Sequence, residues 1–97
     1  MANAPGVEAD IAVLEGAIAA AVGGARSLGD IEQWLQSQRG VLSVDVAGHL
    51  LKSNPPQREF SVVLGGHGGR AVGRTVAVFD LGNGRFAFSE IRSRAVE

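Results

Sequence analysis

The chain contains no cysteine, and its charges of opposite sign almost cancel. Without cysteine there can be no disulfide, no thiolate chemistry and no zinc site built on sulfur, although the compartment is left open. Nine basic and ten acidic residues give a formal net charge of −1. A nearly neutral domain lacks the overall field of a protein that binds nucleic acid or an anionic membrane non-specifically. We therefore expect neither partner.

Lysine and long apolar runs are scarce as well. Only Lys52 is a lysine, and together with the many Ala, Gly and Val residues this indicates a GC-rich, bacterial-like coding bias, which carries no functional information. The apolar stretch 11–25 is too short to span a bilayer, and it lacks the basic flank of a signal peptide. We interpret it as part of an amphipathic helix and expect a cytoplasmic protein.

What is present indicates one small domain over residues 1–97, with residues 1–6 frayed. Apolar residues recur at helical spacing from Val7 onward, and Gly23-Gly24 ends the pattern. This predicts a first helix over 7–22.

A second helix start follows directly. Ser27, with Asp30 three residues later, resembles a capping box and makes Ser27 a plausible N-cap. The apolar stripe that follows predicts a helix over 28–38, with Gly40 as its C′ residue. Trp34 lies on this stripe, where it is either a core anchor or an exposed interface residue.

After this helix the apolar period changes from 3.6 to 2, which is typical of strands. The alternation predicts four strands, over residues 41–51, 58–64, 71–81 and 85–92. Asn83-Gly84 between the last two is a strong signal for a two-residue hairpin turn. We expect an α+β fold, with two N-terminal helices packed on one face of a four-stranded antiparallel β-meander.

The alternation also assigns side chains to the two faces of this sheet. If Gly82 pairs with Arg85, Phe79 lies opposite Phe88 on the core face, together with Leu81 and Phe86. Five apolar residues are then left on the outer face: Val63, Val76, Val78, Ala87 and Ile91. An exposed apolar surface of this kind usually marks an interface. We therefore expect a homodimer that forms through this face, with the first helix as the second choice.

The stretch GGRAVGRT at 68–75 is close to the phosphate-binding loop G-x-x-x-x-G-K-[ST]. That loop needs a helix after it, because the helix N-terminus and its N–H groups hold the phosphates. Here a β-branched, alternating segment follows, and Arg74 stands in the place of the lysine. We interpret the stretch as a glycine-rich hairpin turn and expect no nucleotide.

Polar residues could form one site in the first hairpin. His49 falls on the outer face near Asp45, with Glu59 and Ser61 across the strand pair. A histidine oriented by carboxylates can act as a base or bind a metal. The only other histidine, His67, lies at a glycine-rich loop tip, so we expect no strong metal site.

The loop KSNPPQRE at 52–59 is stiffened by two prolines. A preformed loop of low entropy can act as a recognition element. Its candidate residues are Asn54, Pro55, Pro56 and Arg58. The alternative is a wide hairpin connection that blocks pairing at the sheet edge.

These observations favour a non-enzymatic protein–protein interaction module, of the adaptor, assembly or inhibitor type, with no cofactor. The alternative is a small-ligand or hydrolytic site around Asp45, His49, Glu59 and Ser61. A third interpretation, nucleic-acid binding, would use four arginines, Arg74, Arg85, Arg92 and Arg94.

Overall fold

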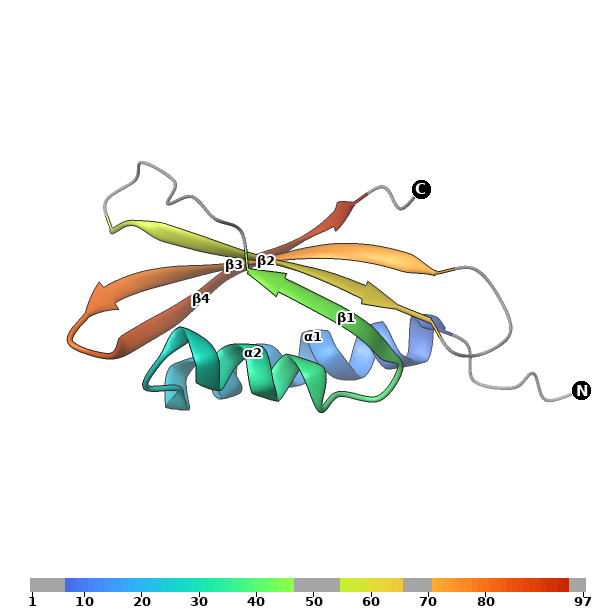
Figure 1. Ribbon diagram of the computed structural model, residues 1–97, viewed down its shortest axis with the longest axis horizontal. Coiled ribbons are helices and arrows are strands. Elements are labelled where there is room, and N and C mark those ends of the chain that lie inside the picture. Colours follow the sequence, from blue (N-terminus) through green and yellow to red (C-terminus); the bar gives the residue numbers. More distant parts are fainter. Residues whose placement is uncertain (1–6, 47–54, 66–70, 95–97) are drawn as a thin grey trace, which may run out of the picture.

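The computed structural model describes residues 7–46, 55–65 and 71–94. In chain order the elements are α1 (Val7–Gly24), α2 (Leu28–Gln36), β1 (Val41–Val46), β2 (Gln57–Leu64), β3 (Val72–Gly82) and β4 (Arg85–Arg94). The four strands form one antiparallel sheet in the order β1-β2-β3-β4, and both helices lie on the same side of it (Figure 1). The predicted α+β architecture is confirmed. The predicted fraying of residues 1–6 lies outside the described residues.

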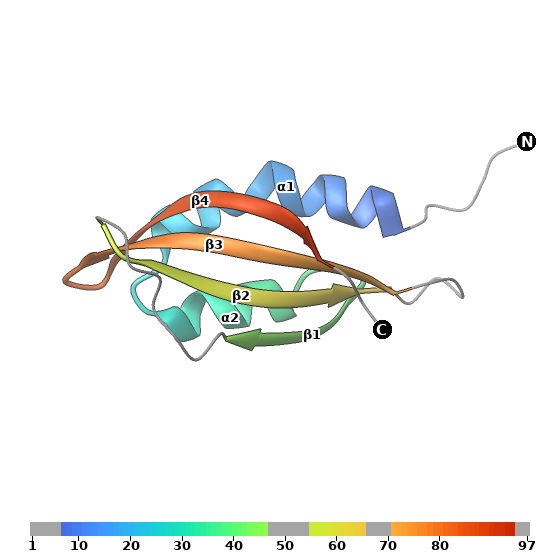
Figure 2. The ribbon, with the colours of Figure 1, turned by 90° about the horizontal axis from the view of Figure 1, so that it is seen from above.

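The helices divide the sheet between them. Viewed from above, α1 lies along β4 and α2 lies beside β1 (Figure 2), and these are also the main helix–strand contacts. The apolar stripe of α1 is wholly buried against the sheet; it consists of Ile11, Leu14, Ile18 and Val22. Neither helix in the described part of the chain is long and apolar enough to cross a membrane.

The start of α2 follows its sequence signal. Ser27 Oγ accepts a hydrogen bond from the backbone N–H of Asp30 at 3.1 Å. The Asp30 carboxylate in turn accepts one from the backbone N–H of Arg26 at 3.0 Å, so two otherwise unpaired donors are satisfied. The helix ends earlier than predicted, with Ser37 as its C-cap. Gly40 is therefore not the C′ residue but lies, with φ +82°, in the turn that leads into β1.

The turn between β3 and β4 is the one that Asn-Gly predicts. Asn83 and Gly84 both have positive φ, 55° and 70°, as a type I′ turn requires. Gly82 pairs with Arg85, as expected. A Cβ on Gly84 would lie 2.9 Å from the backbone oxygen of Arg26, so the hairpin turn packs closely against the connection between the helices.

Two bulges shift the register beyond this turn. Between Asp80 and Gly82 the residue Leu81 is extra, so Phe79 lies opposite Ala87, whereas the sequence predicted Phe88. A second bulge follows where Ala77 pairs with Glu90 and Val78 with Phe88, and it restores the register towards the end of β4. One extra residue reverses the face of every side chain beyond it.

The predicted outer face is therefore wrong for three of its five residues. Val76 and Val78 are fully buried in the core, and Ile91 packs against the core from β4. Val63 and Ala87 do lie on the opposite face, because they pair with Gly73 and Phe79 across the sheet. Phe79 itself was predicted to be in the core, and the same shift places it on the outer side.

An irregularity in the register also changes the predicted alternation of side chains in β1. The pairing of β1 with β2 is irregular between Val41 and Ser43. Leu42 therefore has no directly opposite residue in β2, and it is 60% exposed. Val44 is buried as predicted, and Val46 is 39% exposed at the end of the strand. Trp34 packs against the core from α2, as expected of a core anchor.

Candidate functional site

The face of the sheet that both helices leave open is the main candidate; we call it the helix-free face. The register places the residues of this face in four rows that run across the strands. From one end to the other the rows are Ser43–Val63–Gly73–Arg94, then Asp45–Ser61–Thr75–Arg92, then Glu59–Ala77–Glu90, and finally Gln57–Phe79–Ala87. No helix among the described residues lies over these rows (Figure 1).

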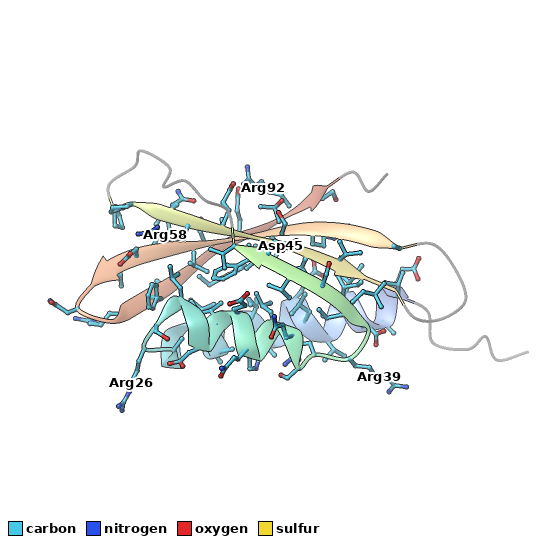
Figure 3. The ribbon with its side chains drawn as sticks, in the orientation of Figure 1. Arg26, Arg39, Asp45, Arg58 and Arg92 are labelled. Atoms are coloured by element: carbon cyan, nitrogen blue, oxygen red, sulfur yellow. The ribbon has the colours of Figure 1, made fainter. Side chains whose placement is uncertain are left out.

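Ion pairs occupy the centre of the helix-free face. Arg92 Nη2 pairs with Glu59 Oε2 across β3, and Arg92 Nε lies 3.4 Å from Glu90 Oε1. In Figure 3 the Arg92 side chain lies on the side of the sheet away from the helices. Ala77, between these charged side chains, is only 1% exposed. The longer side chains of Glu59, Glu90 and Arg92 therefore cover β3 at Ala77.

Apolar residues lie at both ends of this cluster. Val63 is half-buried towards one end, and Phe79 and Ala87 are half-buried at the other. Partial exposure of a phenylalanine leaves apolar area for a partner to cover. From the sequence, Phe79 was predicted to lie in the core and not on this surface. The glycine at position 82, beside the Asn-Gly turn, was the one sequence sign of a nearby bulge; in the structure Gly82 has a positive φ.

The predicted polar site is partly assembled. Asp45 and Ser61 lie directly opposite each other on β1 and β2, and Glu59 follows two residues along on the same face. Glu59 is held by Arg92, a partner that the sequence analysis did not identify. His49 lies outside the described residues. Among the described residues, no group of three or more His, Cys, Asp or Glu side chains is placed to hold a metal ion.

The proline-rich connection is tied to the neighbouring strand. The carbonyl of Pro56 accepts a hydrogen bond from the N–H of Asp80 at 2.8 Å. Arg58 Nε lies 3.6 Å from Asp80 Oδ2, and this nitrogen is buried without a hydrogen-bond partner. Of the candidate recognition residues, Arg58 is thus already engaged within β2 and β3, and Asn54 lies outside the described residues.

The near-match to a phosphate loop leads into a strand. Residues from Val72 onward form β3, so the helix that the motif requires is replaced by a strand, as predicted. Arg74 alternates with Val72 and Val76 on the helix side, and its Nη1 donates to the carbonyl of Gly73 at 2.8 Å. Residues 66–70 lie outside the described residues.

The basic side chains that are described do not form one surface. Arg26 and Arg39 project from the helix layer away from the sheet, whereas Arg92 lies on the opposite side (Figure 3). A shallow pocket of about 250 Å³ lies on the helix layer beside Arg39, lined also by Ala9, Asp10, Val13 and Gln38. Asp10 is buried there, 4.0 Å from the Arg39 Nε and close against Gly40. These contacts join α1 to the turn before β1.

Comparison of the chain with models of protein families, with curated proteins and with solved structures gave no match.

Proposed function

We propose that this protein is a non-enzymatic protein–protein interaction module that binds a partner protein on its helix-free face. One observation carries the proposal: β2, β3 and β4 present half-buried apolar side chains at both ends of an ion-pair cluster. A mixture of partly exposed apolar area and oriented charge is typical of protein interfaces.

The same rows define the chemistry of the partner. An aliphatic or aromatic side chain of the partner would cover Phe79 and Ala87. The cluster of Glu59, Arg92 and Glu90 carries both signs of charge, so the partner should offer charged groups of both signs to it. The low net charge of −1 agrees with a partner that is recognised by local pairing and not by a strong overall field.

The geometry supports this function better than a hydrolytic site. A carboxylate that orients a histidine base must be free to pair with it, but Glu59 is engaged by Arg92. Asp45 and Ser61 face each other on an open sheet surface near the edge strand, whereas small-molecule sites are usually concave and largely enclosed.

A binding experiment with matched variants tests the proposal. Purified wild-type protein, Phe79→Arg and the control Val13→Arg are used as baits in parallel, and retained proteins are quantified by mass spectrometry. Val13 is 64% exposed on α1, on the opposite side of the molecule. We expect a stoichiometric partner on the wild-type and Val13→Arg baits and at least a tenfold loss on Phe79→Arg. Equal retention on all three folded baits would refute the proposal.

A further inference from the structure

The two edges of the sheet are built differently. The β4 edge carries a bulge and four charged residues, Arg85, Glu90, Arg92 and Arg94, and such features prevent edge-to-edge pairing. The β1 edge has neither lysine nor proline, and Asp45 is its one charged residue. Beyond the irregularity at Leu42 it follows a regular register from Ser43 to Val46. In Figure 2, β1 is the outermost element on its side of the sheet.

The β1 edge also exposes large apolar side chains, which a monomer would leave in contact with water. Leu42 is 60% exposed and Val46 is 39% exposed, so half of the large exposed apolar residues of the described chain lie on this six-residue strand. The unpaired N–H and C=O groups of an edge strand are a template for another strand. Apolar side chains beside that template add burial to the backbone hydrogen bonds.

We infer that β1 pairs antiparallel with β1 of a second copy, so that two chains form one continuous eight-stranded sheet. The inference goes beyond the proposed function by naming a second copy as a further partner. It concerns the edge of the sheet, whereas the proposed function concerns the helix-free face.

The strand itself selects one register. Residues directly opposite in an antiparallel pair lie on the same face of the sheet, so a register must match helix-side residues with helix-side residues. A two-fold axis through Val44 does this. It places Ser43 opposite Asp45 of the second copy, and it brings Leu42 beside the second copy's Val46.

The neighbouring registers fail for physical reasons. An axis through Asp45 would put two identical carboxylates directly opposite each other, which is destabilising. An axis through Ser43 would place Val41, which packs against the core, opposite Asp45 on the helix-free face. Registers centred between two residues mix the faces along the whole strand. Repulsion between the two Asp45 carboxylates and the need to match the two faces of the sheet therefore both favour the axis through Val44.

This pairing has a geometric consequence for binding. The two-fold axis stands perpendicular to the sheet, so both helix layers lie on one side and both helix-free faces lie on the other. The two copies then present one surface with two identical ion-pair clusters. A partner that is itself two-fold symmetric would gain from binding both sites at once.

The absence of cysteine allows a direct test of the register. Ser43→Cys and Asp45→Cys are prepared separately and oxidised alone or as an equimolar mixture. Directly opposite Cα atoms about 5 Å apart can be joined by a disulfide. Two copies of the same substituted position would be about 8 Å apart and beyond its reach. We expect a cross-linked dimer in the mixture only. No cross-link in the mixture, or equal cross-linking of either variant alone, would overturn the inference.

A second measurement tests the edge without cross-linking. Analytical ultracentrifugation compares wild-type protein with Leu42→Lys/Val46→Lys and with the control Val13→Lys, after each is shown to unfold cooperatively on heating. We expect a dimer for the wild type and the control and a monomer for the double variant. A monomeric wild type, or a dimeric double variant, would overturn the edge pairing. Neither result bears on the helix-free face, since Phe79→Arg tests that face separately.

Discussion

The two faces of this sheet are made by the same strands but are built for different tasks. On the helix side Phe60, Val62 and Val76 are completely buried. One residue further along the same strands, Ser61 and Thr75 lie on the face that the helices leave open. Stability is therefore concentrated on one side of each strand. The other side is left available for charged and partly apolar side chains that a partner can recognise.

The difference between the two faces should be largest when Phe60 on the helix side and Phe79 on the helix-free face are each replaced by alanine. Phe60→Ala removes a fully buried ring from the core, and we expect a loss of about 3–5 kcal/mol in the free energy of unfolding. Phe79→Ala, on the helix-free face, should cost about 1 kcal/mol, since the ring is only half-buried. Chemical denaturation of both variants measures the difference. Equal losses would mean that both faces contribute to the core.

Gly40→Ala probes how the helix layer is held against the covered face. Its φ of +82° disfavours any side chain, and a Cβ would lie 3.0 Å from the Asp10 Cγ. We expect a loss of about 3 kcal/mol, near the upper end for a strained left-handed residue, because the contact with buried Asp10 adds to it. Gly23→Ala, an open helical position, is the control and should leave thermal stability unchanged or slightly higher.

Two adjacent residues of β3 sharpen the assignment of faces. Val76→Thr would bury a hydroxyl in the core and should cost about 2 kcal/mol. Thr75→Val makes the reverse change on the helix-free face and should alter stability by no more than about 0.5 kcal/mol. Thermal melts of the pair would show the opposite order if the side chains of β3 faced the other way.

The smallest effect is expected at the ion-pair cluster. Arg92→Gln removes the contacts to Glu59 and Glu90. Glu59 is 15% exposed, but the Arg92 side chain that makes both pairs is 48% exposed. Pairs exposed to this degree contribute about 0–1 kcal/mol, so the melting temperature should hardly move. Partner binding, in contrast, should weaken measurably. A large fall in stability with unchanged binding would reverse the roles that we assign to the two faces.

The features that could be predicted from sequence are those with local causes. The Ser27 cap, the Asn83-Gly84 turn and the spacing of the α1 stripe each depend on residues within about one turn of chain. They correctly located both helices and the β3–β4 hairpin. The three charged or polar residues Asp45, Glu59 and Ser61 were also placed on one face, because the alternation in β2 has no bulge.

The faces of β3 and β4 could not be predicted in the same way. The run Val76-Ala77-Val78-Phe79 is apolar at every position, so hydrophobicity does not distinguish its two sides. The outcome depends on bulges near Leu81 and in β4, and β4 is the strand that packs against α1, which is distant in sequence. Arg92 could not be identified as the partner of Glu59 either, because the two residues come from strands that are not neighbours.

The packing of α1 against β4 also has a consequence for how the chain folds during synthesis. The first helix finds its main strand contact in the last strand, so its apolar stripe has no complete binding surface until β4 has left the ribosome. Contacts between segments distant in sequence form slowly. Until then Leu14 and Ile18, which are buried in the folded protein, remain at least partly exposed. A chain that stops before β4 would keep them exposed and would tend to aggregate.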